Sequence, residues 1–576
     1  MFGSDCMKRM ICCLFLIVNV GMYAQSPAKY WIAFTDKNNN GYSVDQPEAF
    51  LSKRALEKRK RFHIEITTQD LPLTKSYVNE LLAMDTSMRL LSQSKWLNGI
   101  SVYSQDENLI KKLENIPFVR YAEKTIQLKQ PELACDSIYR RVSSRSLASA
   151  LSKPSMPENL DMEYGKAEDQ IKINRGQWLH RIGYLGEGVQ MGIFDGGFHN
   201  VDSIRHLEVL RNENRLLCVR NFVKACEDPL RRHSHGTYVL SCIAADVPGE
   251  LVGTAPKVSV CLALTEDASS EHKIEEDNWV AALEWADSLG CDIINSSLGY
   301  TQFDDSTQRR TAADLTGQVS RASQAASIAA SKGIIVCNSA GNAGRGPWFF
   351  IGCPADAKDI IAVGAVDRER NKTTFSSMGP SADGRVKPDA CALGKGVYVA
   401  NPYAKTTLAD GTSFSSPLLA GMIACLWQAF PEKSSFEVME AVRKSGSIAH
   451  APDSLLGYGI SDMWKAYNLL RKDEASYDEK GNLIMTLSLS SFVYEKEPLR
   501  ISIQSRVKTK LTVQAIMRSN QATTSKTYKI KKGKNVILWR AFPGSQSDTY
   551  DFLDLRLQSA EVDYSYIIGV EKADKD

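Results

Sequence analysis

Short apolar runs that alternate with helical stretches from residue 188 onward constrain this chain more than any other feature. The runs span residues 189–194, 258–264, 292–295, 333–336 and 360–363. Runs that are apolar throughout, rather than at alternate positions, are typical of strands buried in a parallel sheet with helices on both faces. We therefore predict an α/β fold. Ligand sites in such sheets lie beyond the carboxyl ends of the strands, so the polar residues that follow the runs are candidates for a functional site.

The regions on either side have different patterns. Before the α/β region, the sequence predicts a small α+β unit, whose elements span residues 30–34, 49–61, 74–84, 89–91, 99–103, 107–116 and 119–122. Residues 125–170 lose periodicity and are rich in Ser, Pro and charge, which indicates a linker open to proteolysis. After residue 475, alternating segments predict a separate β domain, with strands near 483–489, 499–503, 511–516 and 536–539.

The N-terminus carries an apolar run, residues 11–18, that follows Lys8 and Arg9. The run is far shorter than the roughly 18 residues of a membrane-spanning helix. We interpret it as a signal peptide cleaved after Ala24. The alternative is a buried N-terminal helix, but nothing amphipathic surrounds the run. We expect a mature chain that is secreted, periplasmic or at the cell surface, with no transmembrane segment.

Composition limits the classes of function. A chain of 576 residues with 43% hydrophobic and 24% charged residues is globular in type, and its length suggests roughly two to four domains. The net charge of +3 leaves no electrostatic footprint for nucleic acid. Of 13 cysteines, Cys6, Cys12 and Cys13 precede the predicted cleavage site, and the remaining ten suit either disulfides or buried thiols. No C-x-x-C or H-E-x-x-H motif supports a metal site.

Two residues that could carry chemistry follow a predicted strand or open a predicted helix. Asp195 comes directly after the first apolar run and before two glycines, which places a carboxylate in a tight turn at a strand's carboxyl end. His235 opens a segment in which Val239, Leu240 and Ile243 have helical spacing, so we expect its imidazole at the start of a helix. Taken alone, each residue is more often part of an ordinary turn than of a catalytic site.

Ser413 and Asn342 occupy comparable positions farther along the chain. Ser413 lies before a predicted helix with Pro417 in its first turn, where the positive end of the helix dipole favours negative charge on an adjacent oxygen. Asn342 follows the run 333–336 in a Gly-rich turn and could donate its side-chain amide to an oxyanion. The simpler interpretations are a helix cap and an Asn/Gly turn.

The joint occurrence of these residues in the order Asp, His, Asn, Ser makes coincidence implausible. The chain resembles the subtilisin-like serine peptidases, in which the catalytic triad has this order. The resemblance covers roughly residues 172–472 and is carried by Asp195-Gly-Gly, His235-Gly-Thr, Asn295-Ser-Ser-Leu-Gly, Ala340-Gly-Asn and Gly411-Thr-Ser-Phe-Ser-Ser-Pro. Gly196 and Ser415 depart from the usual family residues, but neither removes a catalytic atom. Residues 29–124 resemble the family's inhibitory propeptide in pattern rather than in motif.

The resemblance implies the roles of the candidate residues. Ser413 would be the nucleophile, His235 the general base and acid, Asp195 the group that orients the imidazole, and Asn342 an oxyanion donor. An edge segment would pair with an extended peptide or protein substrate, and nearby residues would leave room for its side chains. The implied substrate-binding residues are Ser297, Leu298, Gly299, Ala340, Gly341 and Gly352, the last at the floor of the first specificity pocket. The chemistry requires no cofactor or metal, and a structural calcium ion is left open.

These interpretations predict five segments: a signal peptide (1–24), a propeptide-like α+β inhibitory domain (25–128), a linker or activation region (129–171), a subtilisin-like α/β domain (172–472) and a β-sandwich-like domain (476–576). The predicted function is an exported serine endopeptidase, with its own propeptide as an intramolecular inhibitor.

Three alternative functions are compatible with parts of this pattern. A catalytically silent, peptide-binding relative is disfavoured by the complete set of Asp195, His235, Asn342 and Ser413. An esterase is disfavoured because no G-x-S-x-G motif surrounds Ser413. A transpeptidase or macrocyclase, which would pass the same acyl group to an amine, stays open.

Overall fold

The computed structural model describes residues 27–132, 139–141, 162–224, 226–471, 474–477, 483–489, 492–494, 498–539, 550–560 and 563–571. The predicted signal peptide and most of the predicted linker lie outside these residues. The chain divides into two compact units at residues 466 and 467. In the described part of the chain, no helix combines the length and the apolar character needed to cross a membrane.

The first unit begins with an N-terminal domain, residues 27–132, built on an antiparallel sheet in the order β2-β3-β1-β4. Because successive strand residues point to opposite faces, Tyr30 and Ile32 pack in a core under two helices, whereas Trp31 is buried on the other face. The predicted order of elements is confirmed: β1 (Ala28–Phe34), α2 (Lys53–Arg61), α3 (Lys75–Ala83), β2 (Arg89–Ser94), β3 (Gly99–Ser104), α4 (Leu109–Leu113) and β4 (Val119–Gln127).

The first predicted helix, 49–61, begins later than expected. The Ser52 hydroxyl accepts the N–H of Ala55 at 3.2 Å and caps the helix at Lys53, after a separate 3₁₀ turn at Pro47–Ala49. The start of α2 is therefore set by the cap.

The rest of the first unit, the α/β domain, is built on an eight-stranded sheet in the order β14-β13-β12-β11-β6-β10-β7-β5. Seven strands are parallel, and the edge strand β5 is antiparallel to β7. The predicted parallel sheet is confirmed, with strands at β5 (Tyr139–Arg141), β6 (Gln190–Asp195), β7 (Leu216–Asn221), β10 (Ser259–Leu264), β11 (Ile293–Ser296), β12 (Ile335–Ser339), β13 (Ile361–Val366) and β14 (Ala390–Leu393).

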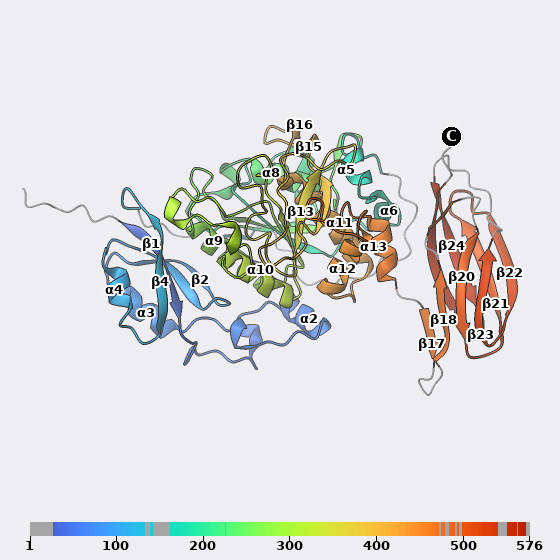
Figure 1. Ribbon diagram of the computed structural model, residues 1–576, viewed down its shortest axis with the longest axis horizontal. Helices are drawn as coiled ribbons and strands as arrows, with labels where there is room; N and C mark the ends of the chain where they lie inside the picture. The colour runs from blue at the N-terminus through green and yellow to red at the C-terminus, as the bar shows by residue number, and fades with distance from the viewer. Residues whose placement is uncertain are drawn as a thin grey trace, which may run out of the picture. The chain divides into compact units, whose positions relative to one another are not determined.

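Helices cover both faces of this sheet (Figure 1). On one face, α9 and α10 contact each other, and α9 also contacts β1 and β2 of the N-terminal domain. On the other face, α8 packs against α11, which is buried along its whole length. The helices of the domain are α5 (Glu168–Lys172), α6 (Gln177–Arg181), α7 (Glu208–Asn212), α8 (His235–Ala244), α9 (Ile274–Leu289), α10 (Arg321–Ser331), α11 (Thr412–Ala429), α12 (Ser435–Ser445) and α13 (Met463–Leu470). Two short strand pairs complete it: β8 (Asp246–Val247) with β9 (Leu251–Val252), and β15 (Val397–Ala400) with β16 (Thr406–Ala409).

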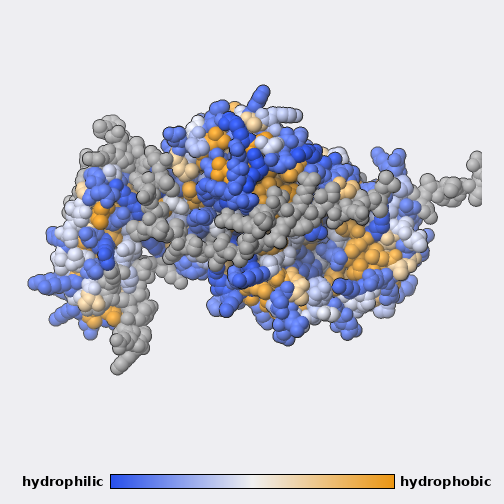
Figure 2. Space-filling view, turned by 180° about the vertical axis from the view of Figure 1, so that it is seen from behind, coloured by the Kyte–Doolittle hydropathy of each residue, from blue (hydrophilic) through white to orange (hydrophobic). Residues whose placement is uncertain are grey.

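The second unit consists of two sheets, β17-β18-β20-β23 and β19-β25-β24-β21-β22, that share one hydrophobic core. Alternate residues of β20 and β21 are buried, which confirms the predicted β-rich C-terminal region. On the face of the molecule that Figure 2 shows, most of the described surface is hydrophilic, with smaller hydrophobic patches. The strands are β17 (Glu474–Tyr477), β18 (Leu483–Leu489), β19 (Phe492–Tyr494), β20 (Leu499–Ser505), β21 (Thr509–Met517), β22 (Thr523–Ile530), β23 (Gly533–Trp539), β24 (Tyr550–Gln558) and β25 (Asp563–Glu571).

Both cysteine states that the sequence left open occur in the described residues. Cys226 takes part in a disulfide. Burial raises the pKa of the Cys391 thiol to about 12 and raises the pKa of Cys425 further. Among the residues that the structure describes, eight cysteines are free and buried: Cys218, Cys242, Cys261, Cys291, Cys337, Cys353, Cys391 and Cys425.

We expect a thiol-reactive dye to leave these eight cysteines unmodified in the native protein, because burial excludes the reagent from all of them and, at Cys391 and Cys425, also suppresses the reactive thiolate. Mass-spectrometric peptide mapping, with and without denaturant, measures the labelling. Cys226 is exposed and should react after mild reduction, which makes it the positive control. Rapid native labelling of any of the eight would contradict the packing described here.

Candidate active site

Three elements bring the predicted triad to one edge of the sheet. Asp195 is the last residue of β6, His235 the first residue of α8, and Ser413 the second residue of α11. Nδ1 of His235 lies 2.9 Å from each carboxylate oxygen of Asp195. Asp195 is fully buried and also accepts the N–H of Gly196 at 2.8 Å. Protein donors rather than water therefore hold this carboxylate.

The environment of His235 changes its basicity. Burial lowers the pKa of the imidazole, but the charge of Asp195 and its hydrogen bond raise the pKa by more, so the net pKa lies above its usual value. Because both atoms facing Nδ1 are carboxylate oxygens, Nδ1 carries a proton and Nε2 is left as the acceptor in the neutral ring. The ring lies beside Phe414, with centroids 5.8 Å apart, and hence beside the start of α11.

Ser413 is held by Ser297, which makes two hydrogen bonds to it. The Ser297 hydroxyl donates to the Ser413 carbonyl oxygen at 2.9 Å, and the Ser413 hydroxyl donates to the Ser297 carbonyl oxygen at 3.4 Å. Asn295 supports this arrangement, since its amide donates to the Ser297 hydroxyl at 3.2 Å. Its amide oxygen accepts the Ser416 hydroxyl at 2.8 Å.

Pro417 explains why the Ser413 carbonyl can accept a side chain. We expected Pro417 in the first turn of the helix, but this was wrong: α11 begins at Thr412, so Pro417 lies inside the helix. Proline has no N–H, and in a regular helix the N–H at this position would bond to the carbonyl four residues earlier, that of Ser413. The missing backbone bond leaves this carbonyl to the Ser297 hydroxyl.

Asn342 follows β12 and is oriented by Thr412. Its amide oxygen accepts two hydrogen bonds from Thr412, from the backbone N–H at 2.9 Å and from the hydroxyl at 3.0 Å. The Thr412 hydroxyl in turn accepts the N–H of Gly341 at 3.2 Å. With the oxygen held, the Asn342 nitrogen has no hydrogen-bond acceptor among the described residues. It is thus available to a ligand beside Ser413.

A cavity of about 220 Å³ adjoins Ser413. A Cβ placed on Gly299 or Gly352 would make only ordinary van der Waals contacts, at 3.7 Å or more. These two glycines therefore leave space for a side chain. None of the described lining residues is charged, so the cavity suits a neutral group. All six predicted substrate-binding residues line it: Ser297, Leu298, Gly299, Ala340, Gly341 and Gly352.

A second buried carboxyl group, Glu266, lies near Asp195. Burial raises the pKa of Glu266 to about 8, so the group is largely protonated at neutral pH. It accepts hydrogen bonds from the hydroxyls of Thr265, at 3.0 Å, and Tyr300. A neutral Glu266 adds no second negative charge beside the triad. Within the described ranges, no cluster of three or more His, Cys, Asp or Glu residues could hold a metal ion.

Comparisons with known proteins agree with this geometry. The Subtilase family model matches residues 186–459, and a model of the Peptidase S8 propeptide domain of Bacteroidota matches residues 29–137. The chain is 31% identical to subtilisin DY of Bacillus licheniformis over 286 residues, 49% of this chain and 92% of that protein. The chain belongs to the subtilase family. This subtilase is also 27% identical over 363 residues to subtilisin NAT of Bacillus subtilis subsp. natto, across 62% and 78% of the two chains.

Solved structures are also similar to this subtilase, and MycP1 is one example. The crystal structure of MycP1 with the N-terminal propeptide removed matches with a TM-score of 0.41 and 20% identity. The match covers 52% of this chain and 96% of that chain.

Sequence reasoning missed several residues around the site of this subtilase. The sequence identifies Thr412 only as part of the serine motif, and its position beside Ser413 is the one signal of its contact with Asn342. Four further cavity residues follow no predicted strand directly, and only the folding of their loops brings them to Ser413. They are Thr301, Trp348, Phe350 and Ser377.

The raised pKa of His235 leads to a pH prediction. The imidazole must be neutral to accept a proton, so kcat/KM should fall as the pH drops through the raised pKa. Asp195→Asn should lower the rate by about 10⁴-fold and move this acidic limb to lower pH, because the charge that raises the pKa is gone. pH profiles of kcat/KM for both proteins measure the shift. An unmoved limb would show that another group titrates.

The contacts of Asn342 lead to a prediction about two residues. Asn342→Leu should lower kcat by about 10²–10³, the loss known for such a donor in subtilisin, with little change in KM. Thr412→Val should lower kcat by roughly 10- to 100-fold, because Asn342 keeps its amide but loses one of the bonds that orient it. Steady-state kinetics on a peptide substrate separate the two constants. A strong rise in KM at constant kcat would mean ground-state binding instead.

Proposed function

We propose that this subtilase is an exported serine endopeptidase that hydrolyses peptide bonds through an acyl-enzyme on Ser413. The observation that carries the proposal is the hydrogen bond from His235 Nδ1 to both carboxylate oxygens of buried Asp195. This pair lies at the edge of the sheet where α11 begins and carries Ser413 in its first turn. This arrangement supports Nε2 as a base for the Ser413 hydroxyl.

The proposed reaction begins when the Ser413 hydroxyl turns from the Ser297 carbonyl to Nε2 of His235. Its Oγ attacks the substrate carbonyl carbon, a C–O bond forms, and the proton passes to Nε2. Asp195 stabilises the resulting imidazolium. His235 then gives the proton to the leaving amine as the C–N bond breaks. A water molecule next attacks the carbonyl carbon of the acyl-enzyme while His235 accepts its proton. The C–O bond to Ser413 then breaks, Ser413 Oγ takes the proton back from His235, and the acid is released.

The negative oxygen of the tetrahedral intermediate needs donors. The Asn342 nitrogen is one, because its oxygen is already occupied by Thr412. The backbone N–H of Ser413, in the first turn of α11, is the second, and the positive end of the helix dipole adds to it. The proposed chemistry requires no cofactor.

The proposed substrate is an extended segment of a peptide or protein. It pairs with the backbone of residues 297–299 and places one neutral side chain in the cavity beside Ser413. Trp348 and Phe350 give this cavity an apolar wall that suits an aliphatic or aromatic side chain.

The nucleophile is tested by Ser413→Ala, which should abolish casein hydrolysis and labelling by a fluorophosphonate probe. Because triad members act together, Ser413→Ala with His235→Ala should cost no more than either change alone. Peptide mapping of the labelled protein identifies the modified residue. Label on another serine, or additive losses, would refute the assignment. Ligated or cyclic products without hydrolysis would favour the transpeptidase alternative.

Maturation is tested by expressing the wild-type chain beside Ser413→Ala. We propose that the N-terminal domain inhibits the enzyme until the linker is cut by the enzyme's own active site and that the signal sequence directs export. The wild-type chain should then appear shortened outside the cytoplasm, and Ser413→Ala should stay uncut. Mass spectrometry of both products measures processing. Equal processing would mean that another protease cuts the linker, and a fully active uncut chain would exclude inhibition by this domain.

A further inference from the structure

The N-terminal domain contacts the α/β domain through its sheet and through a second segment, and both reach Asp287, which also pairs with Lys95 at 3.5 Å. Residues 47–70, which we call the arm, leave the N-terminal sheet between β1 and α3 and carry α2 to a different part of the α/β domain. Figure 1 shows α2 (blue) below α10, away from the sheet formed by β1 to β4. The arm therefore provides a contact that the sheet does not make.

The arm binds at the amino ends of the central strands. Arg54 donates to the carbonyl oxygens of Gly188, at 2.9 Å, and Gly290, at 3.1 Å, and forms an ion pair with Asp292. Lys58 donates to the carbonyl oxygen of Cys291 at 2.6 Å. These partners directly precede β6 and β11. The triad lies at the opposite ends of the strands.

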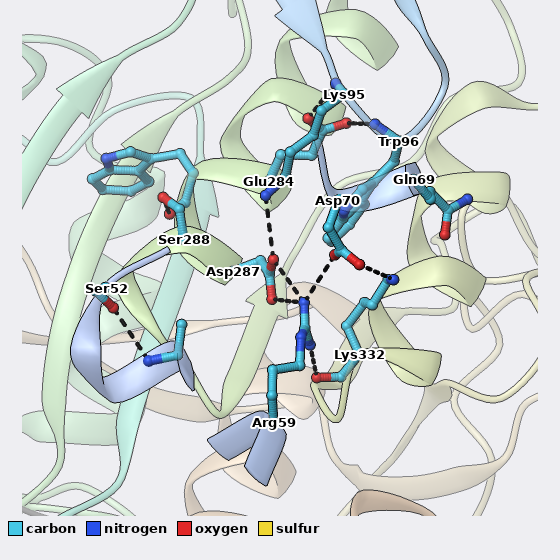
Figure 3. A network of polar contacts seen from close by, with 12 residues as sticks. Ser52, Arg59, Gln69, Asp70, Lys95, Trp96, Glu284, Asp287, Ser288 and Lys332 are labelled. Atoms are coloured by element: carbon cyan, nitrogen blue, oxygen red, sulfur yellow. Dashed lines mark hydrogen bonds and ion pairs between the residues drawn. The ribbon is translucent and has the colours of Figure 1, made fainter. Parts of the chain in front are cut away.

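Arg59 is the centre of a buried ionic network (Figure 3). Its guanidinium donates to both carboxylate oxygens of Asp287 in α9, at 2.9 and 3.0 Å, and to Asp70 at the end of the arm, at 3.3 Å. It also donates to the carbonyl oxygen of Lys332, whose ammonium group pairs with Asp70 at 2.7 Å. Arg59 is 2% exposed and Asp287 is fully buried. Such pairs dissociate slowly, because separation must break several desolvated bonds together.

The position of these charges on α2 indicates that the helix is built for this contact. Arg54, Lys58 and Arg59 lie on one helical face at spacing i, i+4 and i+5, and all three are buried. Lys53 and Lys60 are exposed. A helix with no apolar face gains little stability by itself. Its stability depends on the acceptors that the α/β domain supplies.

The arm also lies far from the substrate cavity. The residue that follows α2, Phe62, packs against Trp427, with ring centroids 6.0 Å apart. Trp427 lies near the C-terminal end of α11, whereas Ser413 lies at its N-terminal end. Their separation of 14 positions in the sequence corresponds to roughly 20 Å of helix at about 1.5 Å per residue. Binding of the arm thus does not compete with a substrate in the cavity.

We propose that the arm is a second anchor for the propeptide, which holds it on the α/β domain after the linker is cut. This anchoring does not depend on the proposed self-maturation. The sheet contact, in which Glu284 accepts the N–H groups of Lys95 and Trp96 at 2.7 and 3.0 Å, is the first anchor.

The test uses the full chain with Ser413→Ala and a recognition sequence for a site-specific protease placed between residues 132 and 139, so that β5, which pairs with β7, stays with the α/β domain. After cutting in the presence of reductant, which removes any contribution from the disulfide of Cys226, size-exclusion chromatography over time gives the dissociation rate of the propeptide. We expect the cut propeptide to remain bound. Arg54→Met or Arg59→Met should speed dissociation by about 30-fold or more.

Lys60→Met is the matched control, because it removes an exposed cation from the same helix, and it should leave the rate unchanged. Rapid loss of the propeptide with an intact arm, or equal rates for Arg59→Met and Lys60→Met, would overturn the proposal. Circular dichroism before cutting verifies the fold of each variant. Asp292→Asn keeps the shape of the side chain that pairs with Arg54 and tests the same contact if the arginine variants do not fold. The assay needs no activity, so its outcome is independent of the role of Ser413.

Discussion

The burial of α11 is the constraint on which most of this structure depends. The helix is enclosed along its whole length, between α8 and strands β11 to β14, so it cannot shift without disturbing the core of the α/β domain. Its first turn carries Ser413, and its last turns meet Phe62 of the arm. One rigid element therefore links the catalytic edge of the sheet to the edge that the propeptide covers. A nucleophile on such a helix needs little loop ordering before reaction.

The charged groups at the two edges of the α/β sheet are arranged differently. At the catalytic edge, Asp195 is the ionised carboxylate beside His235, and the nearby Glu266 is kept largely neutral because burial raises its pKa to about 8. At the opposite edge, Arg59 is bonded to the carboxylates of Asp70 and Asp287. The first arrangement supplies a proton acceptor, and the second supplies a buried ionic interface. Both rely on burial, which strengthens electrostatic interactions.

Much of the fold could be predicted from the sequence. In the N-terminal domain, every predicted element exists, because periodicity alone separates its strands from its helices. In the α/β domain, β7 and β14 were missed, since the runs at 216–219 and 390–393 consist largely of Leu, Ala and Cys and lack the paired Ile residues of three of the predicted runs, so their composition does not distinguish a strand from a helix segment. Pro417 was misplaced because the start of α11 depends on packing around Gly411 and Asn342, which periodicity does not describe.

The sequence by itself determined the order of the catalytic motifs, the parallel sheet and the residues that follow its strands, because local hydropathy and turn chemistry encode these features. Only the tertiary structure decided which donors hold each group. The bonds from Thr412 to Asn342 and from Ser297 to Ser413 join residues 70 and 116 positions apart, and the Arg59 bond to Asp287 spans 228 positions. The basic face of α2 looks like a solvated surface in the sequence. It is buried only because the folded sheet presents carboxylates and carbonyl oxygens to it.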